Sequence, residues 1–260
     1  MIVLLETLAS WGITSDMLLV FAIGFIAQLV DGALGMAFGI VSSTGLMTLG
    51  LSPAAASAVV HTAEIATTGA SGASHAWFRN VDWRLFRRLA ISGMVGGVLG
   101  ALVLSQVDGK AIQPFVAAYL LVMGCIILMR AVRMTLVEDA KPDYAPPLGL
   151  IGGFLDAVGG GGWGPMVTST LVGSGHAPRQ VIGTVSASEF CVAFTIAVIF
   201  FSQLGLTHVG YIVALVAGGL LAAPFGAIVA GRVNPRPLMF AVGLLVTALA
   251  VLQLWRLFPW

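Results

Sequence analysis

Charged side chains are scarce in this sequence. Lys and Arg together number 12 and Asp and Glu 11 in 260 residues, so only 9% of the chain is charged, whereas a soluble domain usually carries about 25%. Hydrophobic residues make up 58% of the chain, and the mean hydropathy is +1.02. A surface in contact with water needs more charge than this, so most of the exterior must face lipid. We expect an all-α integral membrane protein.

Several other features are missing, and each absence excludes a class of protein. The net charge is +1, and no Lys/Arg cluster indicates a nucleic-acid partner. Cys125 and Cys191 both lie in apolar stretches, which favours small hydrophobic fillers over a disulfide. Met1–Gly12 lacks the basic region and the cleavage site of a removable signal peptide. No GxSxG, HExxH or GxxxxGK[ST] motif occurs, so we expect neither an enzyme, nor a cofactor, nor an ATP-driven pump.

What the chain does contain is a series of apolar stretches long enough to cross a bilayer, for which a helix needs about 20 residues. They cover residues 17–49, 53–78, 89–106, 112–130, 147–173, 180–203, 209–230 and 237–258. The first and fifth are longer than the others and are interrupted by glycine. A polar connection from Arg130 to Pro147 divides the chain near its middle. The expected domains are an N-terminal segment (1–16), a first transmembrane repeat (17–130), a cytoplasmic linker (131–146) and a second repeat (147–258).

The two halves resemble each other. The segment 25–35 can be laid on 154–164, which pairs Gly32 with Gly161 and Gly35 with Gly164. After a short deletion, Pro53 falls on Pro178 and Glu64 on Glu189. Chance matches between glycines are common in a glycine-rich chain, but prolines and acidic residues in register favour a duplication. We therefore predict two repeats of four segments each.

The distribution of basic residues indicates how these segments cross the membrane, because Lys and Arg are retained on the cytoplasmic side. If the first and fifth segments are broken helices that enter and leave on one side, only Lys110 and Arg256 fall outside. Eight complete crossings divide the basic residues less cleanly. The re-entrant arrangement leaves three full crossings in each half, so it predicts inverted repeats.

Glycine-rich breaks in the first and fifth segments are the strongest indication of a binding site. A run of four glycines followed by Pro165 cannot form a stable helix interior, and unwound backbone is tolerated only away from lipid. Freed N–H groups at such a break favour an anion, and paired broken helices mark transport sites. Close helix packing is the alternative. The predicted substrate-binding residues are Gly32, Gly35, Ser43, Thr44, Gly159, Gly160, Gly161, Gly162, Trp163, Gly164, Thr168 and Ser169.

Four carboxylates lie inside apolar segments without a Lys or Arg at comparable depth. A charge there costs about 2.5–3.5 kcal/mol, so such residues usually face a cavity or carry protons. His61 shares a helix face with Glu64, as Ser186 does with Glu189. We predict ion coupling here, with structural hydrogen bonding as the alternative. No metal site is expected, because His61 and Glu64 have no third ligand at a diagnostic spacing. The predicted ion-coupling residues are Asp31, His61, Glu64, Asp156, Ser186 and Glu189.

The motifs of both halves resemble the TauE/SafE family of sulfite and sulfonate exporters. The second half contains Gly159-Gly-Gly-Gly-Trp-Gly-Pro165, and the first contains a variant, Val30-Asp-Gly-Ala-Leu-Gly-Met-Ala-Phe-Gly39, followed by His61-Thr-Ala-Glu64. The resemblance extends over about residues 18–256. It implies transport of sulfite, sulfoacetate or a related organosulfonate across the bacterial inner membrane, driven by an ion gradient. Asp31, Leu34 and Met36 depart from a fully glycine-rich break, so the substrate can differ.

The expected function is proton-coupled transport of a small anion by a multi-pass inner-membrane protein. The expected partners are the anion and the lipid bilayer, with no nucleic acid, and a homodimer is left open. One feature opposes this prediction, because four acids without a base repel an anion unless they are protonated or lie off its path. The alternative is therefore a cation or metal-ion transporter that uses the same carboxylates.

Overall fold

The computed structural model describes residues 14–133, 144–174, 176–230 and 235–257. Within these ranges every regular element is a helix, which confirms the all-α prediction. The predicted N-terminal segment and linker fall largely outside the described residues. The elements are α2 (Ser15–Leu34), α3 (Phe38–Thr48), α4 (Pro53–Trp77), α5 (Trp83–Gln106), α6 (Gly109–Arg133), α7 (Ala145–Gly159), η1 (Gly164–Thr168), α8 (Ser169–Gly173), α9 (Pro178–Leu204), α10 (Val209–Ala230) and α11 (Pro235–Leu257).

Both glycine-rich stretches break where the sequence predicts. The helix α2 ends at Gly35, which has φ 67° and donates its N–H to the carbonyl of Asp31. The helix α7 ends in the same way at Gly160, which has φ 65° and donates to the carbonyl of Asp156. A left-handed residue at a helix end is easiest for glycine. Each long apolar stretch is therefore two helical pieces separated by a glycine cap.

These caps change the alignment of the two halves. Asp31 and Asp156 take the same place before the cap glycine, and their separation along the chain equals that of Gly35 and Gly160. Glu64 and Glu189 are separated by that number too. The two helix caps thus favour one constant register between the halves, in which Gly35 is paired with Gly160 and not with Gly164. In a sequence alignment, Gly35 can be paired with any of the four consecutive glycines. Only Gly160 among them has the same left-handed conformation and the same place at a helix end.

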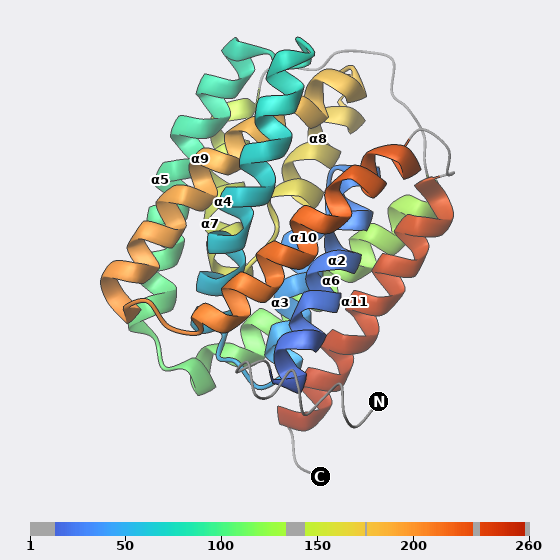
Figure 1. The fold of residues 1–260 in the computed structure, drawn as a ribbon. Coiled ribbons are helices and arrows are strands. Elements are labelled where there is room, and N and C mark those ends of the chain that lie inside the picture. The colour runs from blue at the N-terminus through green and yellow to red at the C-terminus, as the bar shows by residue number, and fades with distance from the viewer. Residues whose placement is uncertain (1–13, 134–143, 175, 231–234, 258–260) are drawn as a thin grey trace.

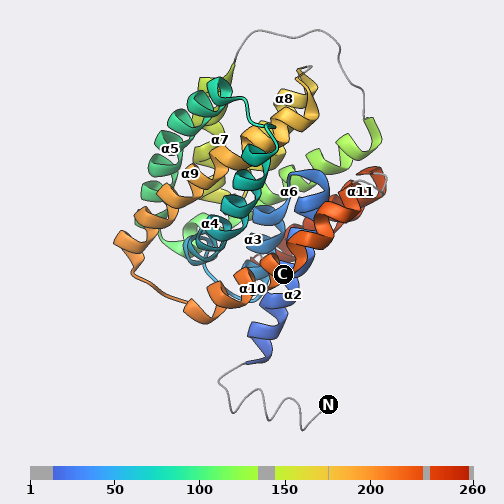
Figure 2. The ribbon, with the colours of Figure 1, turned by 45° about the horizontal axis from the view of Figure 1, so that its top comes forward.

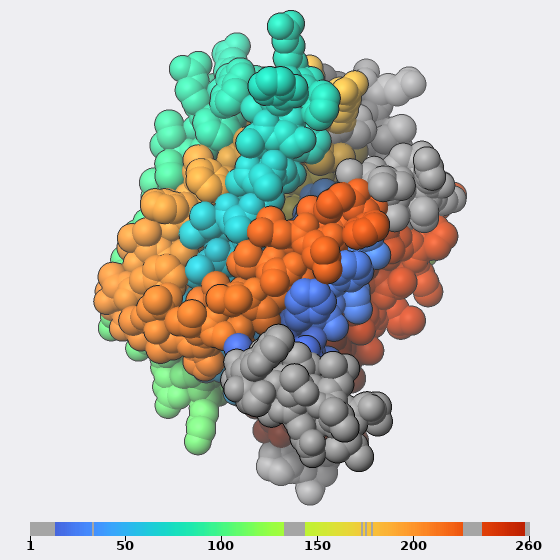
Figure 3. Space-filling view, in the orientation of Figure 1, coloured from blue at the N-terminus to red at the C-terminus, as the bar shows by residue number. Residues whose placement is uncertain are grey.

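The packing of helices is nearly unchanged when the two halves are exchanged. The first helix of each half packs against the second of the three full-length helices of the other, α2 on α10 and α7 on α5. The counterparts α4 and α9 pack on each other, as do α6 and α11, and both pairs lie side by side in Figures 1 and 2. On the face shown in Figure 3, α10 lies across the molecule between α4 and α2. This pattern supports two related halves around a pseudo-twofold axis.

Two contacts between helix ends lie at one end of the molecule (Figure 1). Tyr211 at the start of α10 donates to Asp16 at the start of α2 (3.4 Å), and Arg256 near the end of α11 donates to the carbonyl of Thr48 at the end of α3 (3.5 Å). The pair α2 and α3 therefore returns to the end where it began (Figure 1). The pair α7 and α8 begins and ends at the opposite end in Figure 1. The arrangement supports re-entrant segments in inverted halves.

A labelling experiment tests this inversion. Gln106 donates to Gln203 (3.2 Å), so the ends of α5 and α9 lie together. We expect Lys110→Cys and Gln203→Cys, in a background without Cys125 and Cys191, to react with an impermeant maleimide from one side of the membrane. Arg84→Cys, at the start of α5, should react from the other side. Eight complete crossings would instead place the label at Gln203 on the side opposite Lys110.

Five of the described helices are long and apolar enough to cross a membrane by length and composition. The windows are Ser15–Gly32, Trp83–Gln106, Gly109–Val132, Arg179–Leu204 and Arg236–Leu257. The helix α4 has sufficient length but is not among them, although the sequence predicts a crossing at 53–78. Its buried residues include His61, Glu64, Thr67 and Thr68, and these lower its hydropathy. The low hydropathy of α4 is thus a direct result of the polar site that it contributes.

Candidate functional site

The two breaks meet at the centre of the molecule. A Cβ added at Gly39 would lie 2.6 Å from the Cα of Gly161, and one added at Gly161 would overlap the backbone of Gly39 and Ile40. Gly161 also has φ 147°, which side chains rarely adopt. Gly164 lies against Met36 in the same way. The contact therefore depends on glycine, because there is no space for a methyl group between the two backbones.

Hydroxyl groups link the two breaks. Ser43 donates to the carbonyl of Gly160, and Thr168 donates to the carbonyl of Gly35 (3.4 Å). Ser169 contacts the sulfur of Met36 (3.8 Å). Thr44 differs, because it donates to the carbonyl of Ile40 in its own helix (2.6 Å). Three of the four predicted hydroxyls are therefore at the contact, where they already have acceptors.

The N–H groups of the second break are held by Asp156. Its Oδ1 accepts from the N–H of Gly162 (2.7 Å) and of Trp163 (2.9 Å). Its carbonyl accepts from Gly161 (3.1 Å) and from the cap glycine. At the equivalent place in the first break, Asp31 Oδ1 accepts from Phe38 at 3.4 Å. We predicted that the freed N–H groups would bind an anion. In the structure, two of these groups bind the carboxylate of Asp156, which lies where the substrate was expected.

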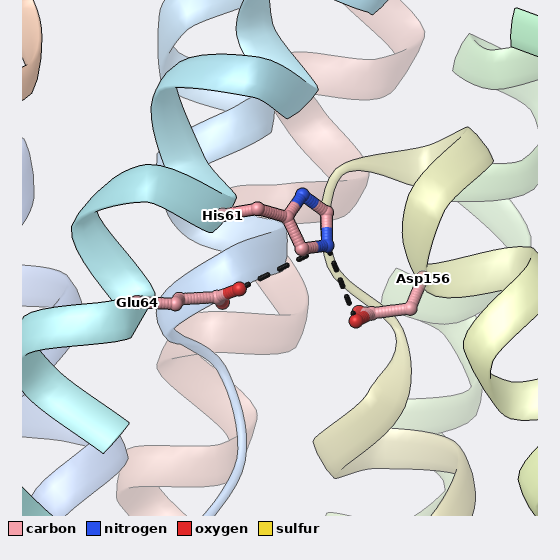
Figure 4. A group of neighbouring side chains, drawn as sticks. All are labelled: His61, Glu64 and Asp156. Atoms are coloured by element: carbon pink, nitrogen blue, oxygen red, sulfur yellow. Dashed lines mark hydrogen bonds and ion pairs between the residues drawn. The ribbon is translucent and has the colours of Figure 1, made fainter. Parts of the chain in front are cut away.

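His61 lies between two carboxylates (Figure 4). Its Nε2 is 3.2 Å from Asp156 Oδ2 and 3.9 Å from Glu64 Oε2. All three residues are at most 1% exposed. Figure 4 shows His61 and Glu64 projecting from α4 toward Asp156 on α7. The fold therefore joins residues that are far apart in the sequence into one buried cluster.

The hydrogen bonds of His61 determine where a proton must be. Nδ1 is 2.8 Å from the carbonyl oxygen of Ser57, which can only accept, so Nδ1 carries a hydrogen. Nε2 then either accepts a hydrogen bond from a neutral carboxyl group of Asp156 or is itself protonated and donates a hydrogen bond to the Asp156 carboxylate. In both cases the contact between Nε2 and Asp156 contains one proton. The cluster therefore joins an imidazole and a carboxyl group through a hydrogen bond that is buried in the protein.

The same cluster changes the argument about metals. His61, Glu64 and Asp156 each offer one ligand atom, and these atoms lie within 4.8 Å of one another. Sequence spacing gives no third ligand beside His61 and Glu64, but the fold supplies Asp156. The reason for excluding a metal therefore does not hold in the folded chain. Glu64 Oε2 has no hydrogen-bond partner among the described residues and is a free ligand atom in this state.

The other predicted coupling residues are arranged less symmetrically. The carboxyl group of Glu64 lies within electrostatic range of Asp156, Glu189 and Asp31, so the four acids are near enough to influence one another. Ser186 takes the place of His61 in the second half. In the described part of the chain, Ser186 makes no hydrogen bond with Glu189. The imidazole therefore belongs to one half of the site only.

Two of the predicted binding residues, Trp163 and Gly159, make packing contacts with neighbouring helices. Trp163 is fully buried, donates its indole N–H to the carbonyl of Val185 (3.3 Å) and lies against Gly93 of α5. Gly159 makes space for the ring of Tyr119 on α6. Gly32 lies within α2, before its cap. For Trp163 the packing explanation accounts for its contacts without a ligand.

Two residues of the site were missed from the sequence. Ser57 donates to the carbonyl of Ala157 (2.6 Å) and so ties α4 to the second break. Tyr119 places a buried hydroxyl beside Gly162. The sequence could have indicated Tyr119, because tyrosine occurs only three times in the chain and Tyr119 is a polar group within an apolar stretch. No such indication exists for Ser57, because serine is common in membrane helices.

Comparisons with known proteins agree with the motifs. The family model described as "Sulfite exporter TauE/SafE" matches residues 20–252. The chain is 41% identical over 251 residues to the "Probable membrane transporter protein YtnM" of Bacillus subtilis (strain 168), and the match covers 92% of this chain and 84% of that protein. No solved structure matches. The similarity includes both breaks and the helices between them.

Proposed function

Because the chain belongs to the TauE/SafE sulfite exporter family, we propose that this membrane transporter moves a small anion such as sulfite, sulfoacetate or another organosulfonate. It acts in the bacterial inner membrane as a secondary transporter coupled to protons. The family description supports the substrate class. The breaks that meet at the centre support a binding site between the halves, as in other transporters with discontinuous helices.

The observation that carries proton coupling is the position of His61. Without it, the carboxylates of Glu64 and Asp156 would give two negative charges beside the breaks. A protonated imidazole 3.2 Å from Asp156 cancels one of them. Anion entry becomes more favourable when the cluster gains a proton, since like charges repel strongly in a low-dielectric interior. A proton and an anion would therefore bind together.

The cap of the second break supports a specific role for Asp156. Its carboxylate bonds to the N–H groups of Gly162 and Trp163. An incoming anion would compete with this carboxylate, and a proton on Asp156 would weaken these hydrogen bonds. We expect substrate binding and protonation of Asp156 to favour each other. Such reciprocal coupling is what a proton symporter requires.

A second candidate function is transport of a divalent cation. The observation that favours it is the set of three ligand atoms on His61, Glu64 and Asp156. Two carboxylates and an imidazole suit a transition-metal ion. Flux measurements in proteoliposomes separate the candidates. Saturable sulfite flux that responds to a pH gradient supports the anion transporter, and saturable uptake of a divalent cation without anion flux supports the alternative.

Neutralising the glutamates tests the coupling. We expect the double variant Glu64→Gln/Glu189→Gln to lose most of the stimulation of sulfite flux by a pH gradient, because neither amide can take up a proton. Asp108→Asn, at an exposed helix start, is the control and should retain it. Sulfite flux that responds to the gradient as strongly in the double variant as in the wild type would exclude this role for the glutamates.

A further inference from the structure

Tyr119 is packed against the second break through two glycines. A Cβ at Gly159 would overlap its ring, and a Cβ at Gly162 would overlap its hydroxyl oxygen. The four-glycine run therefore does more than break a helix, because it also makes space for a phenol from α6. The hydroxyl end of this side chain lies against Gly162, whose N–H group donates to Asp156.

The hydroxyl of Tyr119 is buried and has no hydrogen-bond partner among the described residues. Burial of an unpaired hydroxyl costs about 1–3 kcal/mol in proteins. Phenylalanine would fill nearly the same volume without this cost. A tyrosine is thus less favourable than a phenylalanine here in the absence of ligand. The hydroxyl would be favourable in a state in which it gains a hydrogen-bond acceptor.

The repeat does not require a tyrosine here. In the register set by the cap glycines, the counterpart of Tyr119 in α11 is Leu244, which is 53% exposed. The halves otherwise share paired acids and paired cap glycines. The phenol is therefore an addition to one half, on the side of the molecule that contains the second break.

The other donors around the second break are already engaged. The N–H groups of Gly162 and Trp163 donate to Asp156. The hydroxyl of Ser43 donates to the carbonyl oxygen of Gly160, and the hydroxyl of Ser57 donates to that of Ala157. Among these donors the hydroxyl of Tyr119 is the one without an acceptor. A ligand that brings an acceptor oxygen would satisfy it.

The chemistry of an oxyanion fits this donor. The oxygens of a sulfite or sulfonate group only accept hydrogen bonds, and the sequence has no Lys or Arg between Lys110 and Arg130 or between Lys141 and Arg179. These two stretches, which carry Tyr119 and Gly162, therefore offer an anion no Lys or Arg side chain. We propose that the Tyr119 hydroxyl is a substrate-binding group that donates a hydrogen bond to an oxygen of the transported oxyanion beside Gly162. This inference rests on the proposed anion transport.

The test compares Tyr119→Phe with Tyr144→Phe, which removes the hydroxyl of an exposed tyrosine. Both full-length variants are measured in proteoliposomes for sulfite flux and in detergent for thermal unfolding. In Tyr119→Phe the KM for sulfite should rise about ten-fold, as expected for loss of a hydrogen bond to a charged group. Its Tm without ligand should stay the same or rise, and the increase in Tm caused by sulfite should shrink. Tyr144→Phe should match the wild type in each measurement.

Different results overturn different statements. Sulfite flux in the wild type with an unchanged KM in Tyr119→Phe would show that the hydroxyl does not contact the anion, while the proposed function stands. A lower Tm of ligand-free Tyr119→Phe would show that the hydroxyl has a structural partner, which also overturns the inference. Absence of any sulfite flux or sulfite-induced Tm shift in the wild type would overturn both proposals.

Discussion

Replacing Asp156 with alanine should greatly reduce the amount of folded transporter. The substitution leaves the buried N–H groups of Gly162 and Trp163 without an acceptor, and each unpaired group costs about 1–3 kcal/mol. It also removes the partner of His61 Nε2. The summed loss, about 2–6 kcal/mol, is a large part of the usual stability of about 5–15 kcal/mol. Thermal unfolding and the yield of monodisperse protein in detergent measure it.

Two matched variants separate the contributions of Asp156. Asp156→Asn keeps an oxygen that accepts from both N–H groups, so it should fold better than Asp156→Ala but lose the response of flux to a pH gradient. Asp31→Ala removes the equivalent carboxylate, whose contact with Phe38 is longer at 3.4 Å, and should destabilise less. Equal stability of Asp156→Ala and Asp156→Asn would show that the carboxyl oxygen does not hold the break.

Replacing Gly161 with alanine should strongly reduce transport. The added Cβ would overlap the backbone of Gly39 and Ile40, and φ 147° disfavours any side chain. Overpacking costs about 1–3 kcal/mol and strained backbone about 1–3 kcal/mol, so the two breaks should move apart. We expect sulfite flux per folded molecule to fall at least about ten-fold, the equivalent of 1.4 kcal/mol.

Gly50→Ala is the control for this variant. Gly50 also has a positive φ, 98°, but a Cβ there would meet no atom within 4 Å. It therefore carries the backbone strain without the steric overlap. If Gly161→Ala transports as well as Gly50→Ala, the contact between the breaks is not needed for transport, and the proposed central site would have to lie elsewhere.

Local features of the fold could be predicted from sequence, because they depend on neighbouring residues. A run of glycines ending at Pro165 cannot continue a helix, and the break occurs there. Ser52 and Asp82 precede helices and accept N–H bonds from their first turns. The buried acids were also identified, since a carboxylate in an apolar stretch is conspicuous.

Relations between distant segments could not be predicted in this way. The spacing of His61 and Glu64 shows that they share a helix face, but nothing in it shows that Asp156 lies opposite. Asp156 accepts hydrogen bonds from N–H groups of its own break because of the geometry of the turn between them. The amino-acid sequence does not determine that geometry closely enough to predict it. For the same reason, the orphan hydroxyl of Tyr119 becomes visible only when α6 is packed on α7.

The exchanged packing of the first helices has a consequence for how the protein is made. Because α2 packs on α10 and α7 packs on α5, neither half contains the main partner of its own first helix. The helix α4, with its low hydropathy, has α9 as its principal neighbour, and α9 is synthesised after the whole first half. A ribosome that has completed only the first half has therefore produced no independent folding unit. The two halves have similar arrangements of helices, but each needs the other to fold. A gene split at the linker should therefore yield function only when both fragments are inserted in the same membrane.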